Sequence, residues 1–197
     1  NQAGHRFYDE GEDVWPKRYA IWGRLVAKQP GQVAYAIIDS KSKDLFMPTV
    51  FSATVTDSLD EMAVQLGLSR DQFLATVNEF NNGCGRGEFF PTELDGLETK
   101  GVQPAKTNWA RPIDTPPFYG YELRPGVTFT YLGFRVGPDA KVSFGGLPSD
   151  NVWAAGEIMA GSILGEGYLA GFGMTIGTAF GRIAGKEAGA YARSSAG

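Results

Sequence analysis

Glycine recurs at every fourth position near the end of this chain, at residues 173, 177, 181, 185 and 189. A spacing of four places these residues on one face of a helix. Glycine inside a helix costs about 0.5–1 kcal/mol relative to alanine, so the row gives up several kcal/mol unless close packing compensates. A face without Cβ atoms can approach a sheet, another helix or a planar ligand, and we expect something large or flat against it.

Two simpler interpretations compete with a ligand site. A transmembrane helix with small residues in its interface needs about 20 apolar residues. The uncharged run between Glu166 and Arg182 is shorter than that, which disfavours a membrane span. A small-residue helix packed on a sheet without a ligand stays open.

The segments around the row resemble a known family. They read Ala154-Ala-Gly-Glu, then Gly165-Glu-Gly-Tyr-Leu-Ala-Gly, then Phe180-Gly-Arg-Ile-Ala-Gly. This pattern is similar to the C-terminal flavin-binding segment of the fumarate reductase and succinate dehydrogenase flavoprotein superfamily. Within that superfamily it looks most like tricarballylate dehydrogenase and the related flavoprotein part of precorrin-3B synthase. The resemblance covers nearly the whole chain and is most specific between residues 113 and 190.

The resemblance implies FAD as the cofactor, and it also shows what the sequence lacks. Members of the superfamily hold the dinucleotide with a GxGxxG turn between a strand and a helix. No such motif occurs here. We therefore expect a piece of a larger flavoenzyme that holds flavin poorly by itself, with the remaining N-terminal FAD-binding half as its first partner.

The expected fold class is α+β. The resemblance implies a capping, or substrate-lid, domain over residues 1–117 and the C-terminal part of an FAD-binding α/β domain over residues 118–197. Apolar periodicity predicts helices that carry Tyr19, Trp22 and Val26, and then Leu59 and Met62. Short strands are expected at 33–38, 118–123, 128–131, 134–136, 141–144 and 152–155, and a last helix from about 173 to 192.

The implied reaction is dehydrogenation of a CH–CH bond by hydride transfer to FAD, which needs a group that accepts a proton. Alignment with the fumarate reductase pattern places Arg18 at the proton-shuttle position, with Arg24 as the competitor. An arginine is nearly always charged, so acting as a base requires a special environment. A solvated arginine on an amphipathic helix is the alternative for Arg18.

Departures from the fumarate reductase pattern bear on the substrate. Thr128 follows Pro125-Gly-Val where those enzymes carry a histidine pair, and Tyr168 stands where they carry a carboxylate-binding arginine. These changes disfavour fumarate and succinate. We expect a small polycarboxylate similar to tricarballylate, with Thr128 and Tyr168 as catalytic residues and with substrate contacts from Arg111, Arg124 and Tyr131.

Tyr168 also supports a second enzyme class. The tyrosine and glycine arrangement around it looks like that of 3-ketosteroid dehydrogenases, in which a tyrosine hydroxyl polarises a ketone. A third possibility is that the isolated chain is an inert lid or interaction module. Ordinary surface roles stay open for the arginines, and core or loop-packing roles stay open for Thr128, Tyr131 and Tyr168.

The cofactor contacts implied by the resemblance lie in two short runs. Glu157, after Ala155 and Gly156, matches the acidic residue that contacts the flavin ribityl chain. The backbone amides of Phe172, Gly173 and Met174 match those that meet the pyrimidine edge at a helix N-terminus, where the helix dipole favours oxygen atoms.

Composition narrows the remaining choices. The net charge of −4 offers no basic surface for nucleic acid. A single cysteine, Cys84, excludes an intrachain disulfide and fits a cytoplasmic setting.

The only histidine, His5, is interpreted as structural, and without a histidine–cysteine cluster we expect no metal. A carboxylate substrate and an electron-acceptor protein are the further partners that we expect.

Overall fold

The computed structural model of the chain describes residues 1–165 and 167–195. These residues form two units, Asn1–Pro125 and Gly126–Gly197, which are described separately below. Both helices and strands occur in each unit, and the predicted α+β class is confirmed.

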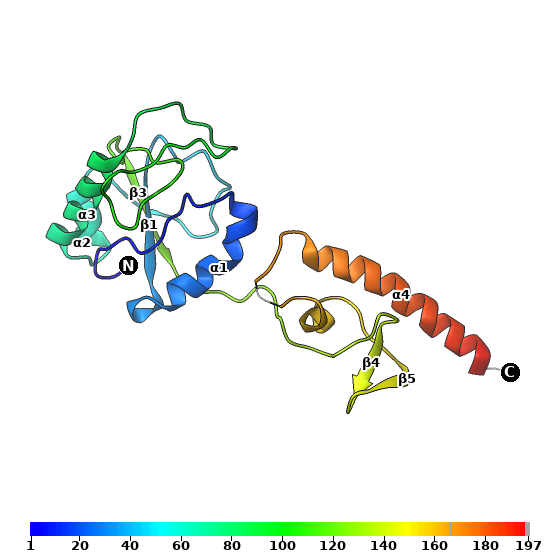
Figure 1. The fold of residues 1–197 in the computed structure, drawn as a ribbon. Coiled ribbons are helices and arrows are strands. Elements are labelled where there is room, and N and C mark those ends of the chain that lie inside the picture. The colour runs from blue at the N-terminus through cyan, green and yellow to red at the C-terminus, as the bar shows by residue number, and fades with distance from the viewer. Residues whose placement is uncertain (166, 196–197) are drawn as a thin grey trace. The chain divides into compact units, whose positions relative to one another are not determined.

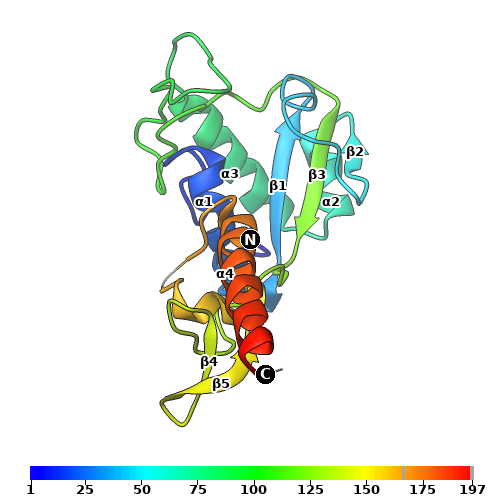
Figure 2. The same cartoon turned by 90° about the vertical axis from the view of Figure 1, so that its right-hand side faces the viewer.

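A three-stranded antiparallel sheet organises the first unit (Figure 2). Its order is β1 (Ala34–Asp39), β3 (Phe118–Leu123) and β2 (Thr54–Thr56), so β3 is the central strand. The β1–β3 register pairs Ala34 with Leu123 and Asp39 with Phe118. Because β3 bonds to strands on both sides, the structure places the division at Pro125 rather than at residue 117. The strand expected to open the second domain is therefore part of the first unit's sheet.

Three α-helices complete the first unit: α1 (Trp15–Ala27), α2 (Leu59–Gln65) and α3 (Arg70–Gly83), with the short 3₁₀ helix η1 at Pro30–Gln32 (Figure 1). The Oγ of Ser58 accepts a hydrogen bond from the amide of Glu61 and caps α2. Met62 and Ala63 of α2 are fully buried and pack with Phe73 and Val77 of α3 and with Phe118 of β3. This cluster is the core of the unit.

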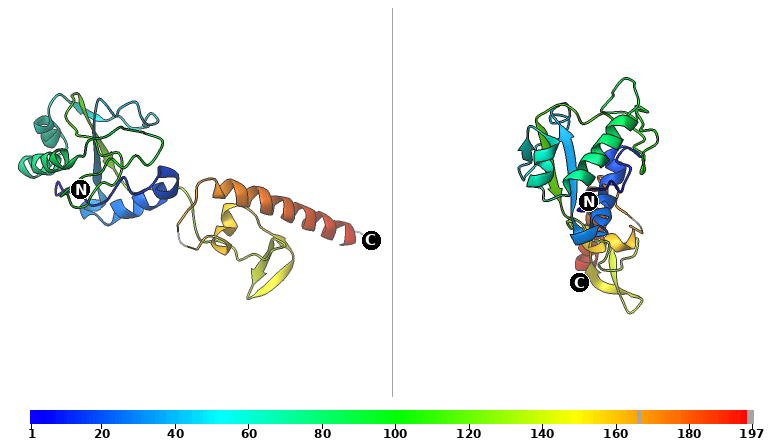
Figure 3. Two further views of the ribbon diagram at one scale, coloured as in Figure 1. Left: turned by 45° about the horizontal axis from the view of Figure 1, so that its top comes forward. Right: turned by 90° about the vertical axis from the view of Figure 1, so that its left-hand side faces the viewer.

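The second unit contains a hairpin, a 3₁₀ helix and one long helix. The hairpin joins β4 (Lys141–Phe144) to β5 (Leu147–Trp153), η2 spans Glu157–Ser162, and α4 spans Phe172–Ser195. Figure 3 shows α4 running past η2 and the hairpin. The strands predicted at 128–131 and 134–136 do not form. Residues 128–134 are instead a loop that bonds to η2, through the amide of Phe134 and the carbonyl of Ile158 at 2.7 Å.

The glycine row lies along α4 as predicted. A Cβ atom built at Gly177, Gly181 or Gly185 would meet nothing within 4 Å in the described part of the chain. At Gly173, by contrast, it would lie 2.9 Å from the Phe129 ring. Beyond the first turn of α4, the described residues therefore do not provide the close packing that the glycine row predicts.

The expectation that α4 is not a membrane span can also be checked. Within residues 1–165 and 167–195, no helix combines the length and apolar character needed to cross a bilayer.

Candidate functional site

Most of the predicted site residues of the second unit gather around η2. The loop over 128–134 lies directly against this helix, and two glycines permit the approach. A Cβ at Gly133 would lie 1.8 Å from the carbonyl oxygen of Ile158, and one at Gly161 would lie 2.3 Å from that of Tyr131. Any larger residue at either position would push the two segments apart. The loop that carries Thr128 and Tyr131 is thus fixed against η2 by backbone contact.

Glu157 begins η2 and connects it to the same loop. Gly156 before it has φ 84° and ψ −154°, a combination open essentially to glycine alone, and this turn redirects the chain from β5 into η2. The Oε1 atom of Glu157 accepts a hydrogen bond from the amide of Thr130 at 2.8 Å. The carboxylate is exposed, and in the described part of the chain no group bonds to its second oxygen. One oxygen therefore orders the loop while the other can accept a ligand hydroxyl.

Tyr168 reaches the start of α4. Its ring lies 4.8 Å from the Phe129 ring, centroid to centroid, with the planes tilted by 55°. Its hydroxyl accepts a hydrogen bond from the amide of Gly173 at 3.1 Å. A Cβ at Gly173 would meet both rings' atoms, so glycine is needed for this packing. Thr128, the loop residue predicted to act with Tyr168, directly precedes Phe129 in the chain.

Two of the three amides expected to face a flavin already have partners. The Phe172 amide donates to the carbonyl of Leu169 at 3.0 Å, and the Gly173 amide donates to Tyr168. Among the described residues, no group accepts from the amide of Met174, and its side chain is largely exposed. Sequence comparison cannot reveal that a tyrosine hydroxyl five residues earlier takes one of these donors.

The chemistry of these groups fits the cofactor that the sequence implies. A flavin offers hydroxyl donors along its ribityl chain and carbonyl acceptors on its pyrimidine edge. Glu157 provides a carboxylate acceptor, and Met174 provides an amide donor in the first turn of a 24-residue helix. The positive end of the helix dipole strengthens that donor. Ala155 and Gly156 lead into this position from β5.

Arg18 belongs to the first unit and is part of a polar chain. Its Nε lies 3.0 Å from Oε1 of Glu12, and the Tyr8 hydroxyl donates a short hydrogen bond to the same carboxylate. Burial, together with the bond to Glu12, raises the pKa of Tyr8 to about 12. Tyr8 is therefore protonated and holds Glu12 beside Arg18. Neither Tyr8 nor Glu12 was predicted, because their spacing from Arg18 has no helical or strand periodicity.

The other two predicted arginines also lie in the first unit, and each already has an intramolecular contact. The guanidinium of Arg124 forms an ion pair with Glu122 at 2.8 Å and is mostly exposed. That of Arg111 lies 4.3 Å above the Phe89 ring. The structure thus brings together the candidates of the second unit, whereas the three arginines occupy separate places in the first.

Two further expectations concern His5 and metals. The Nδ1 of His5 lies 3.2 Å from Nε2 of Gln72 on α3, and the backbone amide of His5 bonds to the side chain of Asn1. These contacts are structural in kind. In the described ranges, no group of three or more histidine, cysteine, aspartate and glutamate side chains is placed to hold a metal ion.

Comparison with known proteins identifies the family of this chain. Residues 1–173 match the family model described as "FAD binding domain". The chain belongs to this FAD-binding family. The match supports the flavoprotein superfamily and FAD as its cofactor, as the sequence predicts.

Individual relatives are consistent with that family. The chain is 30% identical over 200 residues to NADH:fumarate oxidoreductase of Klebsiella pneumoniae (strain 342), covering 98% of this chain and 20% of the enzyme. The open conformation of a flavocytochrome c3 fumarate reductase shares the fold at TM-score 0.70 and 24% identity, over 98% of this chain and 32% of that one. A 3-ketosteroid-Δ4-(5α)-dehydrogenase of Rhodococcus jostii RHA1 matches at TM-score 0.61 and 26% identity, over 94% and 37% of the two chains. The chain thus spans about a fifth to about a third of the proteins it resembles.

Proposed function

We propose that this chain is the capping domain and the C-terminal part of the FAD-binding domain of an FAD-dependent oxidoreductase that forms or reduces a carbon–carbon double bond. The observation that carries the proposal is the gathering of Glu157, Tyr168 and the start of α4 in a chain that matches an FAD-binding family. The first unit would be the cap, and the second unit would carry the flavin contacts.

In such an enzyme, bound flavin would supply the hydride acceptor, since no side chain can play that part. The residues of this chain would bind and orient. Glu157 would accept a ribityl hydroxyl with its open oxygen, and Met174 would donate its amide to a pyrimidine carbonyl. Thr128 would stand beside the Phe129–Tyr168 pair, in a loop held rigidly by η2. Such rigidity favours catalysis because displacing a reacting atom by about 1 Å can lower the reaction rate about 100-fold.

Arg18 is our candidate for proton transfer. Its ion pair with Glu12 keeps the guanidinium positioned, and Tyr8 keeps the carboxylate from swinging away. The negative charge of Glu12 favours the cationic guanidinium, so Arg18 would act most readily as the proton donor when a double bond is reduced. In the dehydrogenating direction it would first have to pass a proton to Glu12 before it could accept one from the substrate carbon.

For the substrate, we propose a small polycarboxylate similar to tricarballylate. Arg111 and Arg124 would supply cations for carboxylates, which arginine binds through paired hydrogen bonds, and Tyr131 would add a hydroxyl. A relative named for fumarate supports a carboxylate substrate. A cytoplasmic location, an electron-acceptor protein and the N-terminal FAD-binding half as partner stay predictions.

A ketone is the second candidate substrate, and a specific contact favours it. Tyr168 presents its hydroxyl beside an aromatic ring, 4.8 Å from that of Phe129, and a polar group in apolar surroundings suits the carbonyl of a flat hydrophobic molecule. The 26% identity to a 3-ketosteroid dehydrogenase is consistent with this alternative.

Flavin titration and substrate assays test the proposal. FAD added to this chain should show weak binding or none, whereas the protein extended by a GxGxxG half should retain the visible flavin absorbance. In that protein, tricarballylate should bleach the flavin band faster than 4-androstene-3,17-dione does, and the reverse order would select the ketone.

Two variants test the assigned residues. Tyr168→Phe and Arg18→Lys should each lower turnover by more than about tenfold. Wild-type rates in both variants would contradict the assignments. If the extended protein holds no flavin, the chain is an interaction module instead.

A further inference from the structure

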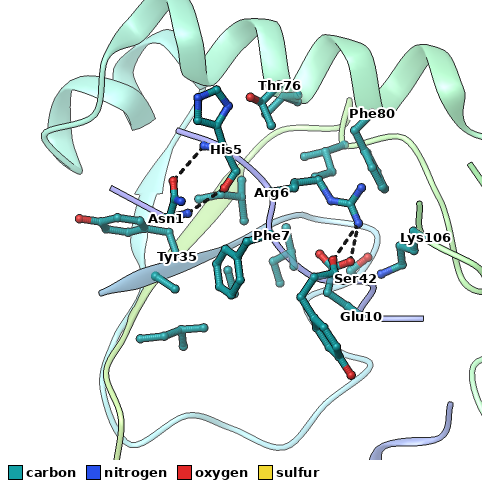
Figure 4. Close-up of a pocket in the computed structure, with 18 of the residues that line it drawn as sticks. Asn1, His5, Arg6, Phe7, Glu10, Tyr35, Ser42, Thr76, Phe80 and Lys106 are labelled. Atoms are coloured by element: carbon teal, nitrogen blue, oxygen red, sulfur yellow. Dashed lines mark hydrogen bonds and ion pairs between the residues drawn. The ribbon is translucent and has the colours of Figure 1, made fainter. Parts of the chain in front are cut away.

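A cavity of about 550 Å³ lies within the first unit, bounded by α1, β1, α3 and the segment before α1 (Figure 4). All of its lining residues belong to Asn1–Pro125, so it is defined without the second unit. Its size lies within the range of about 300–1,000 Å³ that is usual for small-molecule sites. We propose that this cavity binds a small amphipathic monocarboxylate, with the carboxylate at Lys106 and Arg6 and the apolar body against the opposite wall.

The wall of the cavity is mostly apolar. It includes side chains from the N-terminal segment, α1, β1 and α3, namely Phe7, Leu25, Val26, Tyr35, Phe73 and Val77. Burying an apolar ligand against such a surface contributes about 25 cal/mol per Å² of area removed from water. A hydrophobic body therefore gains most of its binding free energy here, and the few polar groups determine which head group it carries.

Three charged side chains lie at one side of the cavity, whereas other polar lining residues such as His5 and Thr76 lie elsewhere around it. Figure 4 shows Arg6, Glu10 and Lys106 together, with Tyr35 across the cavity. Four contacts fix Arg6. Nη1 donates to the carbonyl of Pro104 at 2.6 Å, and Nη2 donates to Glu10 at 2.6 Å and to the carbonyl of Tyr8 at 3.3 Å. The guanidinium also lies 5.0 Å above the Phe80 ring.

One donor of Arg6 remains open. Its Nε is buried, and in the described part of the chain it has no hydrogen-bond partner. A buried charged donor without an acceptor is unfavourable, and an added acceptor recovers that free energy. A ligand oxygen at this side of the cavity would provide that acceptor.

Lys106 supplies the unbalanced charge. Its backbone is fixed by two bonds to Thr99, one from its amide to Oγ1 and one from the Thr99 amide to its carbonyl, each 2.8 Å. The residue is half-buried, and no carboxylate of the described residues lies within ion-pair distance of its ammonium group. Arg6, in contrast, is compensated by Glu10. Arg111 also lines the cavity, and like Lys106 it has no ion pair among the described residues. Cations therefore outnumber the compensating carboxylates, which matches an anionic head group such as a carboxylate.

Calorimetric titration of the chain with 4-phenylbutyrate tests the proposal, with 4-phenylbutan-1-ol as the neutral analogue of the same apolar body. We expect the carboxylate to bind and the alcohol to bind at least about tenfold more weakly, because a charge-assisted hydrogen bond contributes about 1.5–3 kcal/mol. Lys106→Gln should reduce carboxylate affinity by about tenfold and leave the alcohol unchanged. Lys100→Gln, which removes an exposed cation outside the cavity, is the matched control.

A second variant locates the ligand. Val26→Phe narrows the cavity from α1 and should abolish binding of both compounds. If that variant fails to fold, Lys106→Gln still decides the matter. No binding by the unaltered chain, equal binding of acid and alcohol, or equal loss in Lys106→Gln and Lys100→Gln would each overturn the proposal. None of these measurements uses flavin, so the result is independent of the proposed oxidoreductase activity.

Discussion

Replacing Gly177, Gly181 and Gly185 together by alanine should stabilise this chain. Each lies inside α4 with open space where a Cβ would be built. Alanine is favoured over glycine in a helix interior by about 0.8–1.0 kcal/mol, so the triple variant should gain about 2–3 kcal/mol. With a urea m-value of about 1–2 kcal/mol/M for a unit of this size, the midpoint of unfolding should rise by about 1–3 M. Far-UV circular dichroism during urea titration measures this.

The single variant Gly173→Ala is the control for local packing. Its Cβ would lie 2.9 Å from the Phe129 ring and 3.1 Å from the Tyr168 hydroxyl, so it should destabilise the second unit. An unchanged or lower midpoint for the triple variant would refute the reasoning, because it would show that the glycine face is already covered in this chain. In the protein extended by the GxGxxG half, the same three substitutions should lower stability instead of raising it, and they should reduce flavin retention.

Two further predictions concern single positions. Gly161→Ala would place a Cβ 2.3 Å from the carbonyl of Tyr131 and should destabilise the second unit by about 1–3 kcal/mol in urea unfolding, whereas Gly165→Ala, with nothing within 4 Å, should change little. The hydrogen bond from Lys41 lowers the pKa of Asp114 in the folded chain, so this pair's contribution is present above the unfolded carboxyl pKa of about 3.9 and is lost as pH falls through the lower folded value. Asp114 is largely exposed, so Asp114→Asn should cost about 0.2–1 kcal/mol at pH 7 and nothing at strongly acidic pH; an equal loss at both would contradict the ion pair.

The sequence predicts the helices of the first unit well because their signals are local. Leu59 and Met62 recur at helical spacing, and Ser58 caps the helix they begin. The strand Phe118–Leu123 was also predicted, but its partners Ala34–Asp39 and Thr54–Thr56 lie far away in the chain, and these pairings assign it to the first unit. Long-range pairing of this kind leaves no periodic signal.

The loop before β4 shows a different limit. Its β-branched and aromatic residues favour strands, yet the amide of Phe134 bonds to η2, and Gly133 permits that close approach. In the candidate site, the family resemblance identified Glu157 and Tyr168 as site residues. It did not reveal that Thr130 donates to one and Gly173 to the other, since these contacts depend on how the loop and α4 meet.

The glycine row and the site near it place different demands on α4. At the first turn, Gly173 is needed by this chain itself, because Phe129 and Tyr168 occupy the space of a Cβ. Along the next turns, the described residues make no use of the missing side chains, and helix stability alone would favour alanine there. We therefore predict that these positions make a contact outside the described residues. A flavin-binding half packed against α4 would supply that contact, and the triple alanine variant tests this prediction.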